Sequence, residues 1–356
     1  MSRLKRLIKT GLCYLLYLLG IIKAFDCIRE LFPAKRAIKI LCYHSVGNDG
    51  SVPLGLSVTE ENFENQIKFL KKNYCIISLD EAVKMIKDKR EIPPRAIVIT
   101  FDDGYRDNYT HVFEIVKKYN VPITIFLTVN PIQRREALWT DYIITGLNLS
   151  KSRQITLKHF SSEIPLRDHA QKQQAIIKLL NAAKKVSDQD KSALLNSLKE
   201  QLRIDFKSEA FQNRMLSTEM IKEMFDNGIG FGSHTMDHPI LTKISAEKLK
   251  YEVVESKRAI EGIIGNPIKF LAYPNGGRED FDDQVVQLLR ENCYEAAVTG
   301  IRGSNDISCD LFALRRMLIN EYSSLDCFGN FSKALFSAEL SGIFDILLLR
   351  KFRGVL

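Results

Sequence analysis

The sequence predicts an α/β fold in which parallel strands alternate with helices. Short apolar runs alternate with segments of helical periodicity along most of the chain. Most of these runs are continuously apolar, as expected of parallel strands that are buried on both faces. The 356 residues are 45% hydrophobic and 26% charged, which is ordinary for a globular protein and excludes a disordered or fibrous one. An α/β barrel and a doubly wound sheet both fit these observations.

Seven apolar runs are the expected strands, at residues 37–43, 96–101, 123–129, 230–232, 269–273, 295–299 and 316–319. The expected helices lie between them, at residues 59–72, from 79 onward, and at 108–118, 217–226, 246–264 and 282–291. Thr59 and Asp80 are the expected N-caps of the first two helices, because their side chains can accept a hydrogen bond from an unpaired backbone N–H.

One polar segment interrupts this alternation, at about residues 133–213. It contains helical patches at residues 175–185 and 191–202 and no pattern typical of a strand. Since it follows the expected strand at 123–129, we expect a helical insertion that leaves the end of that strand.

The net charge of +8 is concentrated at the two ends of the chain. Residues 1–40 carry nine Lys and Arg against two acidic residues, a net +7, and residues 333–356 carry a net +2. The rest of the chain is therefore close to neutral, at −1. A nucleic-acid-binding protein is expected to carry its basic face on the folded body, so this distribution argues against nucleic acid as a partner.

Both ends are also apolar. Residues 11–22 form a run of about a dozen apolar residues, shorter than the ~20 that a spanning helix needs, and no small-residue cleavage site follows. We therefore expect residues 1–36 to associate with a membrane, as an uncleaved signal-anchor or as a helix lying in the interface. Packing on the protein's own core is the alternative. Residues 326–356 repeat the apolar-then-basic pattern, which leaves residues 37–325 as the catalytic body.

The cysteine content indicates neither a thiolate zinc site nor a disulfide framework. The seven cysteines are odd in number, and no Cys-x-x-Cys pair occurs. Free thiols are typical of a reducing compartment.

Two adjacent carboxylates form the strongest local signal. Asp102 and Asp103 follow the expected strand at 96–101 and precede Gly104, at the end of a parallel strand where α/β folds place their active sites. Neighbouring carboxylates repel each other unless a metal or a proton neutralises one of them. The alternative is a solvated Asp-Asp-Gly turn.

Two histidines form the second signal. His234 and His238 are spaced i, i+4, so on a helical turn both imidazoles would face the same way and could share one metal. Two histidines and one carboxylate are a common open metal site, and the second aspartate would be free to act as a base. A pair of surface histidines is the alternative.

These residues resemble the NodB-homology polysaccharide deacetylases, a family of metal-dependent carbohydrate N- and O-deacetylases. Thr-Phe-Asp-Asp-Gly at 100–104 and Ser-His-Thr-Met-Asp-His at 233–238 are similar to its first two motifs, and the resemblance covers about residues 37–320 apart from the insertion. It implies a distorted (β/α) barrel, Asp102 as general base, and a divalent metal, usually zinc, bound by Asp103, His234 and His238. The metal would activate a water for attack on the acetyl carbonyl, and the metal and a backbone N–H would stabilise the oxyanion.

The third family motif, Arg-x-Pro-Tyr, departs from the pattern here. Alignment on Pro274 places Ala272 where the family arginine orients the base, and Asn275 where a backbone N–H helps to form the oxyanion hole. Arg316 resembles a basic residue near the family's last strand and is the candidate to replace the missing arginine.

The expected general acid also lies outside the motif that supplies it in most of the family. No histidine follows His238, so the late Leu-x-His motif of the family is absent. His44, in Tyr-His-Ser-Val at 43–46, resembles the opening motif of exported poly-N-acetylglucosamine deacetylases, which implies that it is the acid. A buried structural histidine is the alternative. No catalytic role is expected for the other three histidines, His111, His159 and His169.

The expected function is removal of N-acetyl groups from the amino sugars of a polysaccharide or lipid-linked glycan at a bacterial inner membrane. The alternatives are a carbohydrate O-acetyl esterase and a catalytically impaired glycan-binding or scaffold protein. No Gly-x-Ser-x-Gly, Walker or Gly-x-Gly-x-x-Gly motif is present. A glycosidase is disfavoured, because adjacent strand residues point to opposite faces and could not flank one bond.

Overall fold

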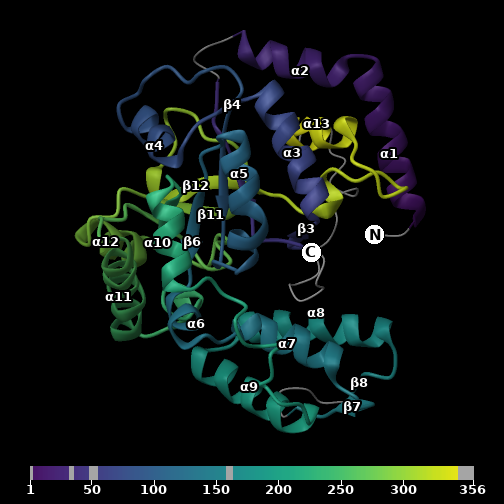
Figure 1. The fold of residues 1–356 in the computed structure, drawn as a ribbon, viewed down its shortest axis with the longest axis vertical. Helices are drawn as coiled ribbons and strands as arrows, with labels where there is room; N and C mark the ends of the chain where they lie inside the picture. Colours follow the sequence, from purple (N-terminus) through teal and green to yellow (C-terminus); the bar gives the residue numbers. More distant parts are fainter. Residues whose placement is uncertain (1–2, 32–35, 48–54, 158–162, 344–356) are drawn as a thin grey trace.

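A closed barrel of seven parallel strands forms the centre of the protein. The computed structural model describes residues 3–31, 36–47, 55–157 and 163–343 (Figure 1). Around the barrel the strand order is β1-β12-β11-β10-β9-β6-β5, and β5 pairs back to β1 with Phe101 opposite Tyr43. The barrel strands are β1 (Lys39–Tyr43), β5 (Ala96–Phe101), β6 (Thr124–Leu127), β9 (Gly230–Ser233), β10 (Phe270–Ala272), β11 (Ala296–Arg302) and β12 (Leu314–Leu318). The closure confirms the predicted distorted (β/α) barrel and excludes the doubly wound sheet.

The barrel strands are apolar on both faces because each face packs on a different layer. Side chains such as Ile40, Val98 and Phe126 belong to one cluster, together with residues of α4 (Leu79–Lys87). Their strand neighbours, such as Leu41 and Ile99, belong to a second cluster with the outer helices. Since side chains alternate along a strand, the first set points into the barrel and the second set points outward. This two-sided burial explains the continuous apolar runs.

Five of the helices around the barrel lie close to their expected positions: α3 (Glu60–Asn73), α5 (Glu114–Tyr119), α10 (Thr218–Asp226), α11 (Ala246–Ile264) and α12 (Asp283–Glu291). The helix α6 (Val129–Arg134) lies where the sequence predicts the end of a strand and the start of the insertion. Short elements complete this part: β2 (Ser45–Val46), β3 (Ser57–Val58), β4 (Cys75–Ile76), a π-helical turn (Asn108–Phe113) and 3-10 turns at Leu241–Lys243, Leu311–Ala313 and Glu321–Ser323. The expected helix at 108–118 is thus divided, because its first part is π-helical.

The N-caps of the first two outer helices differ in outcome. Thr59 caps α3 as predicted, with its hydroxyl accepting from the Asn62 N–H. The prediction of Asp80 for α4 is wrong: Ser78 is the cap, and its hydroxyl accepts from the Glu81 N–H. The helix begins earlier because Ser78 is an equally good acceptor, and Asp80 instead pairs with lysine side chains.

The insertion forms a layer of its own beside the barrel, at the bottom of Figure 1. It consists of the helices α7 (Trp139–Leu149), α8 (His169–Lys185) and α9 (Asp188–Leu202) and an antiparallel ribbon of β7 (Gln154–Ile155) and β8 (Ile164–Pro165). These helices bury their own apolar cluster. The expectation that the insertion contains no strand is wrong, because two-residue strands are too short to leave a periodic pattern in the sequence.

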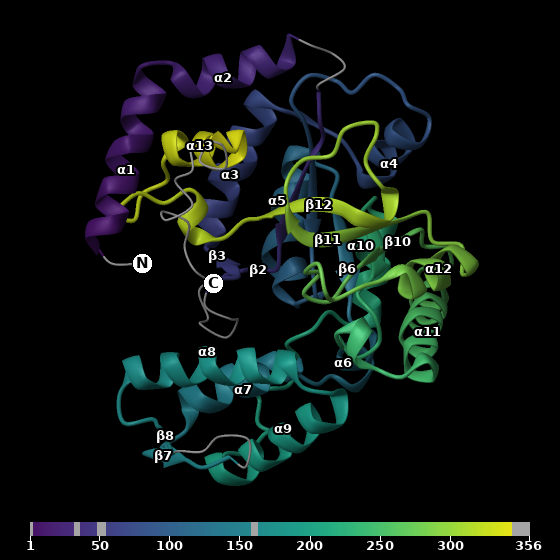
Figure 2. The same cartoon turned by 180° about the vertical axis from the view of Figure 1, so that it is seen from behind.

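The N-terminal segment forms two helices, α1 (Arg3–Leu18) and α2 (Ile21–Glu30), which lie against α13 (Lys333–Ser341) (Figures 1 and 2). Cys13 and Ile22 are buried there in a cluster with residues of α13. Within the described residues, no single helix is long and apolar enough to cross a membrane; α1 and α2 reach that length and composition only together, as a pair bent by 65°. The expected apolar-basic pattern beyond residue 343 lies outside the described residues.

Candidate active site

Residues that follow the barrel strands converge at their carboxyl ends. His44 follows β1, Asp102 follows β5 and His234 follows β9, while Arg316 lies within β12. His44, Asp102 and Arg316 each lie an even number of residues after an inward-pointing residue of their strand, and His234 lies two residues after Gly232, which faces the inward-pointing Phe126. The alternation of side chains therefore directs all four toward the barrel axis. The parallel arrangement places them at the same end of the barrel. These are four of the residues predicted from the sequence.

Asp103, His234 and His238 form a cluster of potential metal ligands. The Nε2 atoms of both histidines lie 3.6 Å from Oδ1 of Asp103, and the three ligand atoms lie within 4.8 Å of one another. The two imidazoles are nearly perpendicular, with centroids 4.6 Å apart. The structure therefore brings together the three residues predicted to bind a metal.

Backbone contacts orient these histidines. Nδ1 of His234 lies 2.7 Å from the Ala272 carbonyl oxygen; because a carbonyl can only accept, Nδ1 carries the proton and Nε2 presents its lone pair to Asp103. The loop before His238 is held by Glu252 of α11, whose Oε2 accepts from the N–H groups of Met236 and Asp237 at 2.7 and 2.9 Å.

The expectation that His234 and His238 share a helical turn is wrong. Both lie in a loop after β9, and Thr235 and His238 have left-handed backbone conformations, with φ of 71° and 55°. The imidazoles converge because of these two unusual conformations and not through helical spacing. Such conformations carry strain that surrounding contacts have to hold in place, and they are common at functional sites.

A left-handed backbone conformation also directs the Asp103 side chain to the same end of the barrel as Asp102. Strand alternation would direct the two side chains apart, but Asp103 has a φ of 73° and Gly104 a φ of 81°. The chain turns sharply here, and a Cβ on Gly104 would lie 2.8 Å from the Leu127 side chain. The Asp-Asp-Gly segment is therefore a tight buried turn, which rules out the solvated turn considered from the sequence.

The surroundings of Asp103 fit a divalent cation. Oδ1 of Asp103 is buried and has no hydrogen-bond partner among the described residues. Burial, and then the negative charges of Asp102 and Asp141, raise the pKa of Asp103. A carboxylate oxygen that faces the Nε2 atoms of two histidines is a donor set that Zn²⁺ and similar ions prefer.

Arg316 holds Asp102 in the interior of the barrel. Its Nη1 and Nη2 donate to Oδ1 and Oδ2 of Asp102 at 2.7 and 2.6 Å, and its Nε donates to the Thr299 carbonyl at 2.8 Å. Burial alone would raise the pKa of Asp102, but the charge and hydrogen bonds of Arg316, together with the nearby imidazoles of His234 and His44, outweigh it, so that the pKa lies well below its usual range. Asp102 is therefore an ionised carboxylate, although it is 3% exposed.

His44 lies beside this ion pair. Ligand atoms of His44, Cys42 and Asp102 fall within 4.8 Å of one another, and the Cys42 thiol donates to Oδ2 of Asp102 at 3.4 Å. Burial lowers the pKa of His44 to about 4, although the charge of Asp102 opposes this. Nδ1 of His44 is buried without a hydrogen-bond partner among the described residues.

Asn275 lies in the tight loop after β10, with a φ of 59°. The loop approaches β11 so closely that a Cβ on Gly276 would lie 2.4 Å from the backbone nitrogen of Gly300. No described residue accepts a hydrogen bond from the Asn275 N–H. This N–H is consequently available to a ligand, as its expected role requires.

Several residues at the site were missed from the sequence. The indole of Trp139, in the insertion, donates to the His238 carbonyl at 3.3 Å, and buried Asp141 accepts from the Tyr105 hydroxyl at 3.2 Å. Glu252 could have been noticed, because it is an acidic residue on the buried face of α11. The contacts of Trp139 and Asp141 leave no local sequence signal.

The three histidines without an expected role have different positions. His111 pairs with Glu60 at 2.9 Å, away from the cluster, and His169 begins α8. His159 lies outside the described residues.

Comparisons with known proteins identify the family. The polysaccharide deacetylase family model matches residues 89–297, more than half of the chain. YxkH of Bacillus subtilis (strain 168), provisionally named a polysaccharide deacetylase, is 23% identical over 85% of this chain and 78% of its own length. The poly-β-1,6-N-acetyl-D-glucosamine N-deacetylase of Staphylococcus epidermidis (strain RP62A) is 29% identical over 49% of this chain, and the match spans 60% of that enzyme, less than two thirds of its length.

A solved structure supports the fold. The Streptococcus pyogenes deacetylase PplD in complex with acetate superposes with a TM-score of 0.55 at 18% identity, covering 83% of this chain and 96% of that one. The barrel and the family match together confirm the resemblance inferred from the two motifs and the expected hydrolase class. The chain belongs to the polysaccharide deacetylase family.

Proposed function

We propose that this protein is a metal-dependent hydrolase that removes N-acetyl groups from the amino sugars of a glycan or lipid-linked precursor. The observation that carries the proposal is the adjacency of two groups: the Asp103–His234–His238 cluster, and an Asp102 carboxylate kept ionised by Arg316. The first can hold a cation and the second can accept a proton. The names of relatives such as the Staphylococcus epidermidis enzyme support an N-acetylglucosamine polymer as the substrate class.

In the proposed mechanism, each residue acts on a defined part of the amide. Asp102 accepts a proton from the attacking water as the new C–O bond forms. The Asn275 N–H donates to the carbonyl oxygen on which negative charge develops. Burial lowers the pKa of His44 to about 4, so its imidazole is neutral at rest. It receives the proton that the adjacent Asp102 takes from the water, and it gives this proton to the leaving nitrogen as the C–N bond breaks. The products are acetate and a free amine.

Asp103, His234 and His238 would hold the divalent metal, for which zinc is the proposed ion. Bound there, it would supply Lewis acidity toward the water and the acyl oxygen. The Ala272 carbonyl and Glu252 keep the ligands in place, and the two histidines stay neutral because burial lowers the pKa of each.

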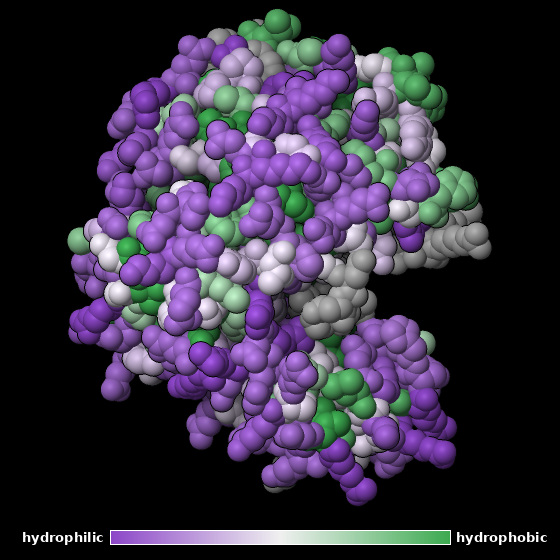
Figure 3. Space-filling model, in the orientation of Figure 1, coloured by the Kyte–Doolittle hydropathy of each residue, from purple (hydrophilic) through white to green (hydrophobic). Residues whose placement is uncertain are grey.

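We further propose that α1 and α2 place the enzyme on a bacterial inner membrane. Among the described residues, ten of the fifteen exposed large apolar side chains lie between residues 7 and 31: Leu7, Ile8, Tyr14, Leu15, Tyr17, Leu18, Leu19, Ile21, Ile28 and Leu31. Hydrophobic patches are visible at the top and upper right of Figure 3, where Figure 1 places α2 and α1. Arg6 and Lys9 make contacts within the protein. The proposal therefore rests mainly on the exposed apolar side chains and less on the basic residues. A bent pair of amphipathic helices such as α1 and α2 can lie in the interface of a bilayer with its apolar side chains in the lipid.

Removal of a metal ligand is expected to abolish both metal binding and acetate release. Wild-type protein should hold about one zinc per chain and release acetate from chitooligosaccharide, with EDTA abolishing the activity and zinc restoring it. Asp103→Ala and His238→Ala should lose the metal, measured by elemental analysis, whereas the His111→Ala control should keep it. Acetate release by metal-free wild-type protein would contradict the proposal. Release of acetate only from O-acetylated glycans would favour the esterase. A wild-type protein that holds the metal but releases no acetate would favour the glycan-binding alternative.

Replacement of Arg316 by Lys is expected to move the acidic limb of the pH–rate profile upward. A lysine cannot make the bidentate contact, so the pKa of Asp102, which Arg316 now holds low, should rise and the base should be protonated over a wider acidic range. The measurement is kcat/KM against pH, with circular dichroism and zinc content as controls for folding. An unchanged profile with normal turnover would show that Arg316 does not support the base.

His44→Ala should bind metal normally and lose ~10²–10⁴-fold in kcat, the usual contribution of a general acid or base. The reason is that the leaving nitrogen would depart without a positioned proton donor. Steady-state acetate release and zinc content measure the two effects, with His111→Ala as the matched control. Turnover at the wild-type rate would leave His44 as a buried structural histidine.

Charge placed on the exposed apolar face is expected to prevent membrane binding. Leu15→Asp with Leu18→Asp should reduce co-sedimentation with phosphatidylglycerol-containing vesicles, because two carboxylates would have to enter the apolar boundary. Leu149→Asp, an exposed leucine of α7, is the control. Equal sedimentation of both variants would contradict the proposal, as would a change from dimer to monomer in gel filtration without an effect on vesicles.

A further inference from the structure

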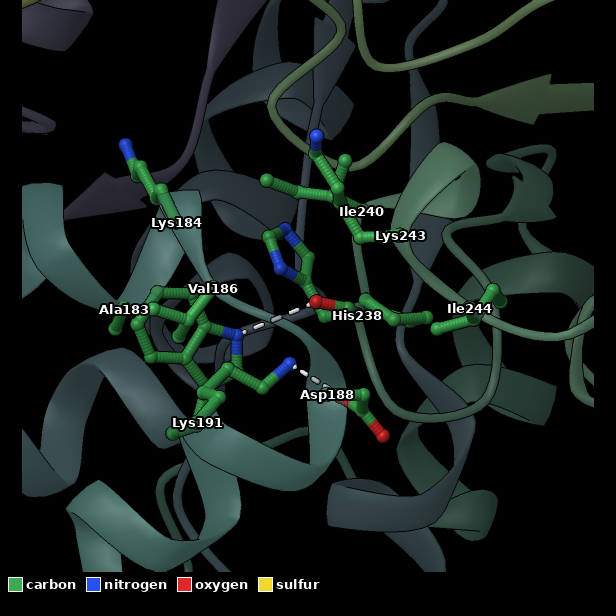
Figure 4. A pocket seen from close by; sticks show the side chains of 11 residues that line it. Ala183, Lys184, Val186, Asp188, Lys191, His238, Ile240, Lys243 and Ile244 are labelled. Carbon is green, nitrogen blue, oxygen red and sulfur yellow. Dashed lines mark hydrogen bonds and ion pairs between the residues drawn. The ribbon is translucent and has the colours of Figure 1, made fainter.

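A small pocket joins the insertion to the candidate metal site (Figure 4). Its walls come from the first residue of α7, the C-terminal end of α8, the start of α9 and the loop after His238. The His238 imidazole points into it, so a molecule bound at the metal cluster would extend past these walls. Of the lining residues, three are lysines and one is an aspartate: Lys184, Lys191, Lys243 and Asp188.

The insertion is fixed firmly against the site at this point. Trp139 donates to the His238 carbonyl at 3.3 Å, and Lys191 lies 5.3 Å from the centre of the Trp139 ring. Lys191 is also paired with Asp188 at 2.7 Å and is 9% exposed. This lysine therefore has a structural role, and its charge is compensated.

The other two lysines make no such ion pair among the described residues. Lys184 and Lys243 are exposed, and neither ammonium group makes an ion pair or hydrogen bond with another described residue. Figure 4 shows their side chains on either side of the His238 imidazole, extending in the same direction. Both lysines line the same pocket as His238, so they lie beside the candidate metal site. Partial burial lowers the pKa of Lys184, and the negative charge of Asp280 opposes this effect.

Two exposed lysines that make no ion pair with another described residue, placed beside a metal site, favour anions and disfavour cations. A polymer of N-acetylglucosamine becomes increasingly cationic as it is deacetylated, because each free amine can be protonated. A rim of lysines would repel such a product. An anionic substituent next to the N-acetylated sugar would instead be attracted and could receive charge-assisted hydrogen bonds from both ammonium groups.

We propose that Lys184 and Lys243 select a substrate in which the N-acetylated sugar is linked to an anionic group, a phosphate or a carboxylate. This inference rests on the proposed deacetylase function and narrows it. The insertion supplies Lys184 and the barrel loop supplies Lys243, so the subsite exists only where the two parts of the chain meet. Both lysines act as specificity residues, because they touch the substituent and not the acetyl group.

The test compares anionic with neutral substrates. Acetate release is measured on N-acetylglucosamine 1-phosphate, on a disaccharide of N-acetylglucosamine and glucuronic acid, and on neutral diacetylchitobiose. Wild-type enzyme should prefer one of the anionic substrates, and which one distinguishes phosphate from carboxylate. The double variant Lys184→Ala/Lys243→Ala should lose this preference: the ratio of its kcat/KM for that anionic substrate to its kcat/KM for diacetylchitobiose should fall ~10-fold. The fall should come mainly from a higher KM, because hydrogen bonds to a charged group are lost.

Lys185→Ala is the matched control, because Lys185 follows Lys184 on α8 but does not line the pocket, and its ratio should equal that of the wild type. Calorimetric binding of N-acetylglucosamine 1-phosphate and of N-acetylglucosamine provides a readout that needs no turnover. Tighter binding of the phosphate that is lost in the double variant would support the subsite even if no acetate were released, which would contradict only the deacetylase function. Equal use and equal binding of neutral and anionic sugars by the wild type would overturn the inference.

Discussion

The candidate site depends on one buried ion pair, Asp102 with Arg316. Two carboxylates lie next to each other at the end of β5, where little water reaches them, and ionisation of both would be unfavourable without compensation. Arg316 crosses the barrel interior and neutralises the first with two hydrogen bonds. The second, Asp103, has no hydrogen-bond partner for its Oδ1 among the described residues, and it faces two imidazoles. The division of roles between the two aspartates thus follows from which of them the arginine reaches.

Much of this arrangement could be predicted from the sequence, because a closed parallel barrel leaves strong local signals. Strands buried on both faces are continuously apolar, and this pattern locates the acidic pair at the end of a strand. His234 is indicated by its spacing from His238, and the role of His44 is implied only by the resemblance to the deacetylase family. The contact of Arg316 with Asp102 could not be predicted from a local sequence pattern, because only the pairing of β12 with β1 brings the two residues together.

The remaining features could not be predicted because they depend on backbone conformation and long-range contact. The i, i+4 spacing of His234 and His238 suggested a helical turn, whereas two left-handed residues bring them together. Trp139 and Lys184 are distant in sequence from every motif, and they reach the site only because the insertion folds back over the loop that contains His238. Nothing in their immediate sequence indicates that.

The hydrogen bond from His234 to the carbonyl of Ala272 has an evolutionary consequence. Every amino acid carries a backbone carbonyl, so the orientation of this histidine is independent of the side chain at position 272. That position can therefore lose an arginine without disturbing the neighbouring imidazole, provided that another strand delivers a guanidinium to Asp102. In this chain the guanidinium reaches Asp102 from β12, so the carboxylate and the imidazole are oriented by two different strands and neither depends on the side chain at position 272.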